Sequence, residues 1–208
     1  MSENGDAEEL KYSIHYDGDE EPSEHYTKDG KAKVQYANGD TFEGDFVDGK
    51  KTGQGIYFWK EQNATYDGEW NEDVRTGNGK FTYPDGSKYV GQWKENQRSG
   101  KGVMTYSNGD SYDGEFKNGL RDGQGTYSYD NDKSNLTGNW ENDKFVSGKW
   151  RWNDKTQFVG AFNNNIPTGK GIFAFIDGNQ NNGCYEKGAW RSQSAVYNQI
   201  YALENSEM

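Results

Sequence analysis

The sequence from Tyr66 to Ser111 contains the same pattern twice, and this repetition restricts the fold more than any other feature of the chain. Tyr66-x-Gly68-x-Trp70 is followed by a Gly-x-Gly pair and by Tyr-Pro-Asp-Gly, and the same order of residues begins again at Tyr89. A third opening lies at Tyr112, again 23 residues later. A fixed period of this length predicts supersecondary units that stack on one another.

Each repeat is predicted to be a β-hairpin. In the motif aromatic-x-Gly-x-aromatic, side chains alternate with a period of two, so both aromatics and the glycine point to one face of a strand. The positions between them carry acids such as Asp67 and Glu69, which predicts one aromatic face and one charged face. Glycines beside the aromatics leave room for rings to lie over the backbone.

Turn residues separate the predicted strands. The residue seven positions after each opening tolerates positive φ, as tight hairpin turns require; these residues are Gly49, Asp73, Asn96, Gly119, Asp143 and Asn165. Asn-Gly or Asp-Gly pairs then lead into the next unit. The order predicts an all-β fold: an elongated single-layer antiparallel meander built from consecutive hairpins, without a helix between residues 16 and 190.

The repeats define the expected domain organisation. Residues 1–15 are predicted to be a flexible acidic N-terminus, residues 16–190 the repeat array, and residues 191–208 a tail that could form a short helix. Within the array we expect a degenerate first repeat over 16–41, which opens at Tyr16-x-Gly18, and a closing half-repeat over 186–190. The intervening repeats open at Phe42, Tyr66, Tyr89, Tyr112, Leu136 and Phe158.

The composition calls for an aromatic core. The net charge of −11 and the scarcity of Leu, Ile and Val are typical of disordered chains. However, 15% of the residues are aromatic, and each Tyr or Trp can bury about 150–250 Å². A few rings in each repeat can therefore replace an aliphatic core.

Charge and cysteine content narrow the function classes. Acidic chains lack the clustered Lys and Arg that neutralise phosphates, which argues against nucleic acid and, less strongly, against anionic membranes. The single cysteine, Cys184, excludes an internal disulfide framework and fits a reducing compartment. With no signal-like N-terminus and no apolar run of about 18 residues, we expect an intracellular, cytoplasmic protein.

The repeated motif resembles the MORN repeat family, whose units open Tyr-x-Gly-x-Trp and continue through Gly-x-Gly to Tyr-x-x-Gly. The resemblance covers about residues 16–190. It implies a meander of hairpins.

Within that family, the chain is similar to the members found in the radial spoke head of motile cilia. The residues that carry this likeness are Asn38–Gly44, Gly53–Tyr57, Tyr83–Tyr89, Pro167-x-Gly169-x-Gly171 and Gly183-Cys184. Leu136 at an aromatic position and an insertion after Gly18 depart from the pattern. The resemblance implies a structural subunit of the cytoskeleton, located in the axoneme of a cilium or flagellum, whose partners are other radial spoke head proteins.

Enzyme chemistry finds little support in the sequence. His15 and His25 both lie in the irregular N-terminal region, and Cys184 has no histidine near it. The Gly-x-Gly pairs recur in every regular repeat and precede strands, which favours a structural role over a phosphate loop. We therefore expect no catalytic residue, no cofactor and no metal.

The aromatic face is the candidate binding surface. An apolar side of a single-layer sheet is either covered by its own rings or bound by a partner, and Tyr and Trp dominate binding hot spots. We expect partner subunits, or a second copy in a homodimer, to contact Tyr66, Trp70, Tyr89, Trp93, Tyr112, Phe116, Trp140, Phe158 and Phe162.

The alternative is a peripheral membrane adaptor that binds phosphoinositides, a role suggested for some relatives of the family. It would require a cluster of cations on one surface. The candidates are Lys50, Lys51, Lys88, Lys94, Arg98 and Lys101, and acidic residues lie among them.

Overall fold

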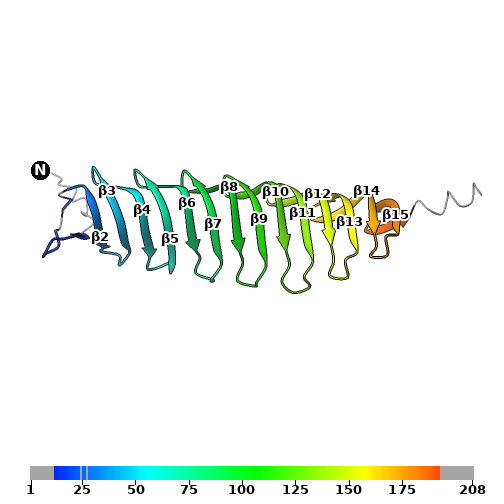
Figure 1. Cartoon of the computed structure of the whole chain (residues 1–208), viewed down its shortest axis with the longest axis horizontal. Coiled ribbons are helices and arrows are strands. Elements are labelled where there is room, and N and C mark those ends of the chain that lie inside the picture. Colours follow the sequence, from blue (N-terminus) through cyan, green and yellow to red (C-terminus); the bar gives the residue numbers. More distant parts are fainter. Residues whose placement is uncertain (1–11, 24, 27, 193–208) are drawn as a thin grey trace, which may run out of the picture. The chain divides into compact units, whose positions relative to one another are not determined.

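The computed structural model describes residues 12–23, 25–26 and 28–192, and the chain divides into two compact units at Arg98 and Ser99. In both units consecutive strands lie side by side and run antiparallel (Figure 1). The described residues contain no helix. The predicted all-β fold of consecutive hairpins is therefore confirmed.

The first unit contains seven strands, and each pairs with the next in sequence order. They are β1 (Tyr12–Tyr16), β2 (Gly30–Tyr36), β3 (Thr41–Val47), β4 (Lys50–Trp59), β5 (Ala64–Asn71), β6 (Val74–Thr82) and β7 (Lys88–Lys94).

The second unit contains the strands that follow, paired in the same way. They are β8 (Gln97–Thr105, whose first two residues belong to the first unit), β9 (Ser111–Lys117), β10 (Leu120–Ser128), β11 (Asn135–Glu141), β12 (Lys144–Arg151), β13 (Gln157–Asn163), β14 (Ile166–Ala174), β15 (Gln180–Glu186) and β16 (Ala189–Ser192).

The predicted turn positions are confirmed. All six have positive φ, with values of 68° at Asp73 and 66° at Asp143, for example. In the turn between β5 and β6, Glu72 has φ of 47° and so both central residues are left-handed, as in the hairpin turns that match the twist of the strands.

The hairpins that open at Phe42, Tyr66, Tyr112 and Phe158 each contain a β-bulge at the first glycine of the Gly-x-Gly pair. Between β5 and β6 the register shifts after Gly68↔Gly79, and Gly77 there has φ of 56°. The side chain of Glu69 folds over this bulge, and its Oε1 accepts a hydrogen bond of 2.7 Å from the backbone N–H of Asn78. The bulge explains why the two glycines of the pair differ: the first needs a left-handed backbone.

The predicted N-terminal boundary is wrong. β1 starts at Tyr12, inside the segment expected to be flexible, and Ile14 is only 2% exposed and pairs with Val34. Ile14 therefore occupies the opening position of the first repeat, whereas Gly18, with φ of 89°, lies in the turn that follows β1. The sequence motif did not show this because an aliphatic residue replaces the opening aromatic.

The predicted closing half-repeat is also misplaced. Lys187 and Gly188 have φ of 50° and 76° and form the turn between β15 and β16. Gly183 pairs with Gly171, so the last repeat opens at Asn181, 23 residues after Phe158. A polar residue at the opening position hid this repeat. Of the tail predicted to be helical, residues 191 and 192 end β16, and the rest lies outside the described residues.

Candidate partner-binding surface

The nine predicted binding residues lie on one face of the strands and are buried there. The exposed fraction is between 0 and 6% for each of Tyr66, Trp70, Tyr89, Trp93, Tyr112, Phe116, Trp140, Phe158 and Phe162. They belong to what we call the inner row, the opening residue of each repeat and the residue four positions later. Tyr66 contacts Trp70 and Trp93 edge-on, with 5.2 Å between ring centroids in both pairs. The inner row is therefore the core of the sheet, and contact of these rings with a partner stays a prediction.

Glycine makes room for the inner row, as predicted. A Cβ atom at Gly79 would lie 2.4 Å from the hydroxyl oxygen of Tyr66 and 2.6 Å from its ring. That hydroxyl donates a hydrogen bond of 3.0 Å to the carbonyl oxygen of Glu69 at the bulge. Burial in this position raises the pKa of the Tyr89 phenol, which has the same place in the next repeat, to about 12.

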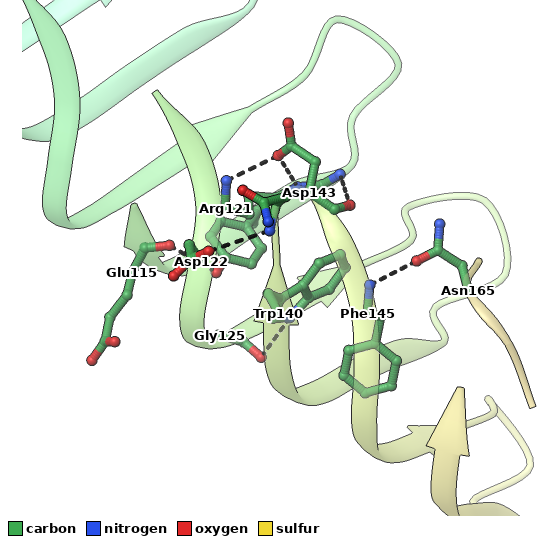
Figure 2. Close-up of polar contacts among 10 residues, drawn as sticks. Glu115, Arg121, Asp122, Gly125, Trp140, Asp143, Phe145 and Asn165 are labelled. Carbon is green, nitrogen blue, oxygen red and sulfur yellow. Dashed lines mark hydrogen bonds and ion pairs between the residues drawn. The ribbon is translucent and has the colours of Figure 1, made fainter. Parts of the chain in front are cut away.

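The tryptophans of the inner row join successive repeats. The indole Nε1–H of Trp70 donates to the carbonyl oxygen of Gly55 in the preceding repeat, at 3.0 Å. Trp140 does the same to Gly125, at 3.2 Å (Figure 2). Each tryptophan thus uses its polar atom to fix the spacing between hairpins, while its ring fills the core.

A column of cations lies against the inner rings, a role that was not predicted from the sequence. The residue nine positions after the opening is Lys51, Arg75, Arg98 or Arg121 in four consecutive repeats. The guanidinium of Arg75 lies 4.9 Å from the ring centroid of Trp93, and that of Arg121 lies 4.6 Å from the ring of Trp140. These are cation–π contacts between one repeat and the next.

The same cations bind the turn of the following repeat. The Nε atom and the backbone N–H of Arg121 both donate to Oδ1 of Asp143, and its Nη2 donates to the Asp143 carbonyl oxygen (Figure 2). Arg75 makes the equivalent three bonds to Asn96. The turn residue therefore supplies an acceptor as well as positive φ.

Rings from the second strands of the hairpins, or from the residue directly after such a strand, form an outer row over the inner one. They are half-buried and comprise Tyr36, Tyr57, Trp59, Phe81, Tyr83, Tyr106, Tyr127, Tyr129, Trp150, Trp152 and Phe173. Tyr57 lies 6.1 Å from Trp70 between centroids, and Tyr127 lies 6.2 Å from Trp140, so the outer row covers the inner row. The accessible part of the aromatic face is therefore the outer row.

Buried carboxylates hold two of the outer rings. Asp110 is 7% exposed and accepts hydrogen bonds from the Tyr127 hydroxyl, at 2.7 Å, and from the Asp130 backbone N–H, at 2.8 Å. Asp40 likewise accepts hydrogen bonds from the Tyr57 hydroxyl and from the Lys60 backbone N–H, each at 2.9 Å. In the two repeats between these, the corresponding positions carry Ala64 with Phe81 and Ser87 with Met104.

The repeated geometry has a counterpart among known sequence families. A family model described as MORN repeat matches residues 42–63, 66–88, 89–111, 112–133 and 158–180, together more than half of the chain. The chain belongs to the MORN repeat family. The matched ranges begin at five of the predicted openings, whereas residues 134–157, which include the irregular Leu136 unit, are not among them.

A curated relative carries the same repeats. The MORN repeat-containing protein 3 of Xenopus laevis is 33% identical to this chain over 52 residues. The match spans 25% of this chain and 22% of that protein, so the chain matches less than a quarter of the relative's length.

Two solved structures share features of the fold at low sequence identity. One is the TCP domain of SAS-4 of Drosophila melanogaster in complex with a proline-rich motif of Ana2, with a TM-score of 0.48, 16% identity, and 78% of this chain and 93% of that chain covered. The other is the TCP10c domain of Drosophila melanogaster Sas-4, with a TM-score of 0.43, 14% identity, and 76% and 98% covered.

The other face of the MORN hairpins is less uniformly charged than predicted. Glu43, Asp67 and Asp113 are exposed there, but β-branched residues share their row, and Ile56 and Val90 are 46% and 53% exposed. Such residues suit the backbone of a strand even where they meet solvent. The second acidic position, as in Glu69, covers the bulge and so has a structural use.

His15 and Cys184 each make a local contact within their own unit. Nε2 of His15 lies 2.8 Å from the carbonyl oxygen of Asp19, and burial together with a hydrogen bond to Glu186 raises the pKa of the half-buried Cys184 thiol. A raised pKa keeps the thiol protonated and unreactive near neutral pH. Among residues 12–192, apart from positions 24 and 27, no group of three or more His, Cys, Asp or Glu side chains could hold a metal ion.

The cations proposed for a membrane surface are partly paired within the first unit. Nζ of Lys50 lies 3.0 Å from a carboxylate oxygen of Glu72, and Nζ of Lys51 lies 2.7 Å from Asp73. Arg98 lies over the ring of Tyr89. In the part of the chain that the structure describes, no helix is long and apolar enough to cross a bilayer.

Proposed function

We propose that this MORN-repeat protein is a non-enzymatic scaffolding subunit that binds partner proteins through the outer row of its aromatic face. The observation that carries the proposal is the half-buried state of the outer row. Its rings are fixed by contacts with their neighbours, and each still presents an edge or a face to solvent. Rigid aromatic side chains of this kind lose little conformational entropy on binding.

The two rows have different tasks in this proposal. Trp70 is 5% exposed, and so it stabilises the sheet and contributes little contact area. Trp59, the last residue of β4, and Tyr83, which directly follows β6, are accessible on the same face and contribute the contacts. Acidic residues in the adjoining turns orient the partner and raise the association rate.

For the setting we propose the radial spoke head of a ciliary or flagellar axoneme, with other spoke head proteins as partners. The support is the sequence likeness stated above, in the segments Asn38–Gly44 and Tyr83–Tyr89 and in the Pro167–Gly171 motif. MORN repeats by themselves specify no location.

The test is capture of axonemal proteins by the tagged full-length chain. The unmodified chain, a Trp59→Leu/Tyr83→Leu double variant and a Val90→Thr control would be incubated with extracts of isolated axonemes, and bound proteins identified by mass spectrometry. Val90 lies on the opposite face and is 53% exposed, so the control changes a surface away from the rings.

We expect the unmodified chain and the control to retain spoke head subunits, and the double variant to lose most of them. Recovery of axonemal proteins without any spoke head subunit would refute the proposed setting. Equal recovery by all three chains would refute the outer row as the binding surface.

A further inference from the structure

We propose that the outer row of the first unit binds a proline-rich, basic segment in the polyproline II conformation. This inference rests on the proposed function, because it names the chemistry of the partner that the same rings would bind. The relevant rings are Tyr36, Tyr57, Trp59, Phe81 and Tyr83.

These five rings form an unbroken ladder across the strands. Tyr36 stacks on Tyr57 with 5.8 Å between centroids, and Tyr57 lies 4.4 Å from Trp59. Trp59 lies 5.6 Å from Phe81, which lies 4.6 Å from Tyr83. A chain that crosses the strands along this ladder meets an aromatic surface at every step.

The period of the ladder fits one backbone conformation. Each hairpin contributes two strands about 4.8 Å apart, so equivalent rings such as Tyr36, Trp59 and Tyr83 recur about every 10 Å. A polyproline II helix makes one turn in three residues and rises about 9 Å in that turn. One turn of the ligand therefore matches one repeat, and the same ligand face meets a ring in each.

The ladder also offers hydrogen-bond donors. Neither the indole N–H of Trp59 nor the hydroxyl of Tyr83 has a hydrogen-bond partner within the described residues. A polyproline II backbone has no internal hydrogen bonds, so its carbonyl oxygens are free to accept from such groups. Aromatic grooves that bind proline-rich segments use this combination of ring faces and side-chain donors.

Acidic residues in the turns beside the ladder favour a proline-rich segment that is also basic. The turns that follow Trp59 and Tyr83 carry the exposed carboxylates of Glu61 and Asp85 against the cation Lys60. On the same face, Lys51 is paired with the carboxylate of Asp73, and the guanidinium of Arg75, which keeps its charge, is held against Asn96 and the ring of Trp93. A segment with Arg or Lys between its prolines complements this border.

The experiment measures binding of synthetic peptides to the full-length chain by tryptophan fluorescence and calorimetry. The probe is a peptide of about 15 residues with the repeat Arg-Pro-Pro, which spans about five turns. A peptide with the repeat Arg-Gly-Gly has the same charge without the preformed helix, and Glu-Pro-Pro has the helix with the opposite charge.

We expect Arg-Pro-Pro to bind at least about tenfold more tightly than either control peptide. The Trp59→Leu/Tyr83→Leu variant should lose at least about tenfold in affinity, while Val90→Thr keeps it. Circular dichroism and urea unfolding will show whether the double variant is folded. If it is not, the comparison of the three peptides on the unmodified chain decides the matter by itself.

Equal binding of Arg-Pro-Pro and Arg-Gly-Gly would overturn the polyproline II assignment, and equal binding of Glu-Pro-Pro would overturn the charge preference. If no peptide binds while axonemal capture still depends on Trp59 and Tyr83, the inference fails and the proposed function stands. If the peptide binds as expected but no spoke head subunit is captured, only the proposed setting fails.

Discussion

Arg121 and Asp143 lie in consecutive repeats, 22 residues apart, and three hydrogen bonds of 2.9 to 3.0 Å connect them. Asp143 also has φ of 66°, a conformation that few side chains adopt without strain. One residue thus meets two demands, a left-handed backbone and a side-chain acceptor. Substitutions can separate these demands.

We expect Asp143→Asn to cost less than about 0.5 kcal/mol of unfolding free energy, because Asn keeps both the acceptor and the tolerance of positive φ. Asp143→Gly keeps only the backbone freedom and should cost about 1 kcal/mol. Asp143→Ala keeps neither and should cost about 2–3 kcal/mol. Urea unfolding of the three variants measures the order.

The natural repeats supply the comparison for this series. Seven residues after the opening, where this repeat has Asp143, two other repeats have Asn96 and Gly119. If Asp143→Gly and Asp143→Ala were equally destabilising, backbone strain would play no part. If Asp143→Gly were neutral, the bonds from Arg121 would add nothing to stability.

The indole hydrogen bond between Trp70 and Gly55 gives a second prediction. Trp70→Phe removes the N–H donor and leaves a ring that fits, since Phe116 and Phe162 occupy the same position in other repeats. We expect a loss of about 1–2 kcal/mol in unfolding free energy. Trp59→Phe is the matched control, because the N–H of Trp59 has no partner among the described residues. Equal losses for the two variants would contradict a structural role for the bond to Gly55.

Glycine at two kinds of position gives a third prediction. Gly79→Ala places a methyl group 2.4 Å from the hydroxyl oxygen of Tyr66, which is fully buried and cannot move away. We expect a loss of about 3 kcal/mol. The added methyl group in Gly119→Ala would have no atom within 4 Å. This variant should therefore lose only about 1–2 kcal/mol of unfolding free energy, from the strain of a side chain at φ of 82°. Chemical denaturation of both variants tests the order, and the reverse order would mean that the Tyr66 ring is not held against the backbone.

Much of the fold could be predicted from the sequence because the residue types within each repeat determine its turns and the face to which each side chain points. The turn residue seven positions after each opening predicted positive φ correctly from Gly49 to Asn165. The alternation in Tyr66-x-Gly68-x-Trp70 correctly predicted which side chains share a face. The first and last repeats were misplaced because Ile14 and Asn181 replace the opening aromatic, and only strand pairing identifies them.

The candidate surface was harder to predict than the fold. Tyr57 and Trp70 lie on the same face, and alternation along a strand does not say which ring covers the other. The cation column could have been found, because Lys51, Arg75 and Arg121 share one offset from their openings. The function of this column depends on contacts with the next repeat, such as that of Arg75 with Asn96. The pattern within one repeat does not predict such contacts.

The buried carboxylate of Asp110 gives the last prediction, a dependence of stability on pH. Burial opposes its ionised form, but hydrogen bonds from the Asp130 N–H, the Tyr127 hydroxyl and the Asn108 amide outweigh burial and lower its pKa. A group whose pKa is lower in the folded state stabilises the fold above its unfolded pKa, which is about 3.9 for Asp. This stabilisation is lost as the pH falls through the folded pKa.

We therefore expect Asp110→Asn to be less stable than the unmodified chain at pH 7, and the difference to shrink progressively below about pH 4. Urea unfolding of both chains at a series of pH values measures this difference in unfolding free energy. Because the other carboxylates titrate in the same way in both chains, their contribution cancels when one value is subtracted from the other. Asp113→Asn, an exposed carboxylate on the opposite face, is the control for the loss of one charge. A difference between Asp110→Asn and the unmodified chain that stays constant down to pH 2 would show that the ionised form of Asp110 is not what stabilises this turn.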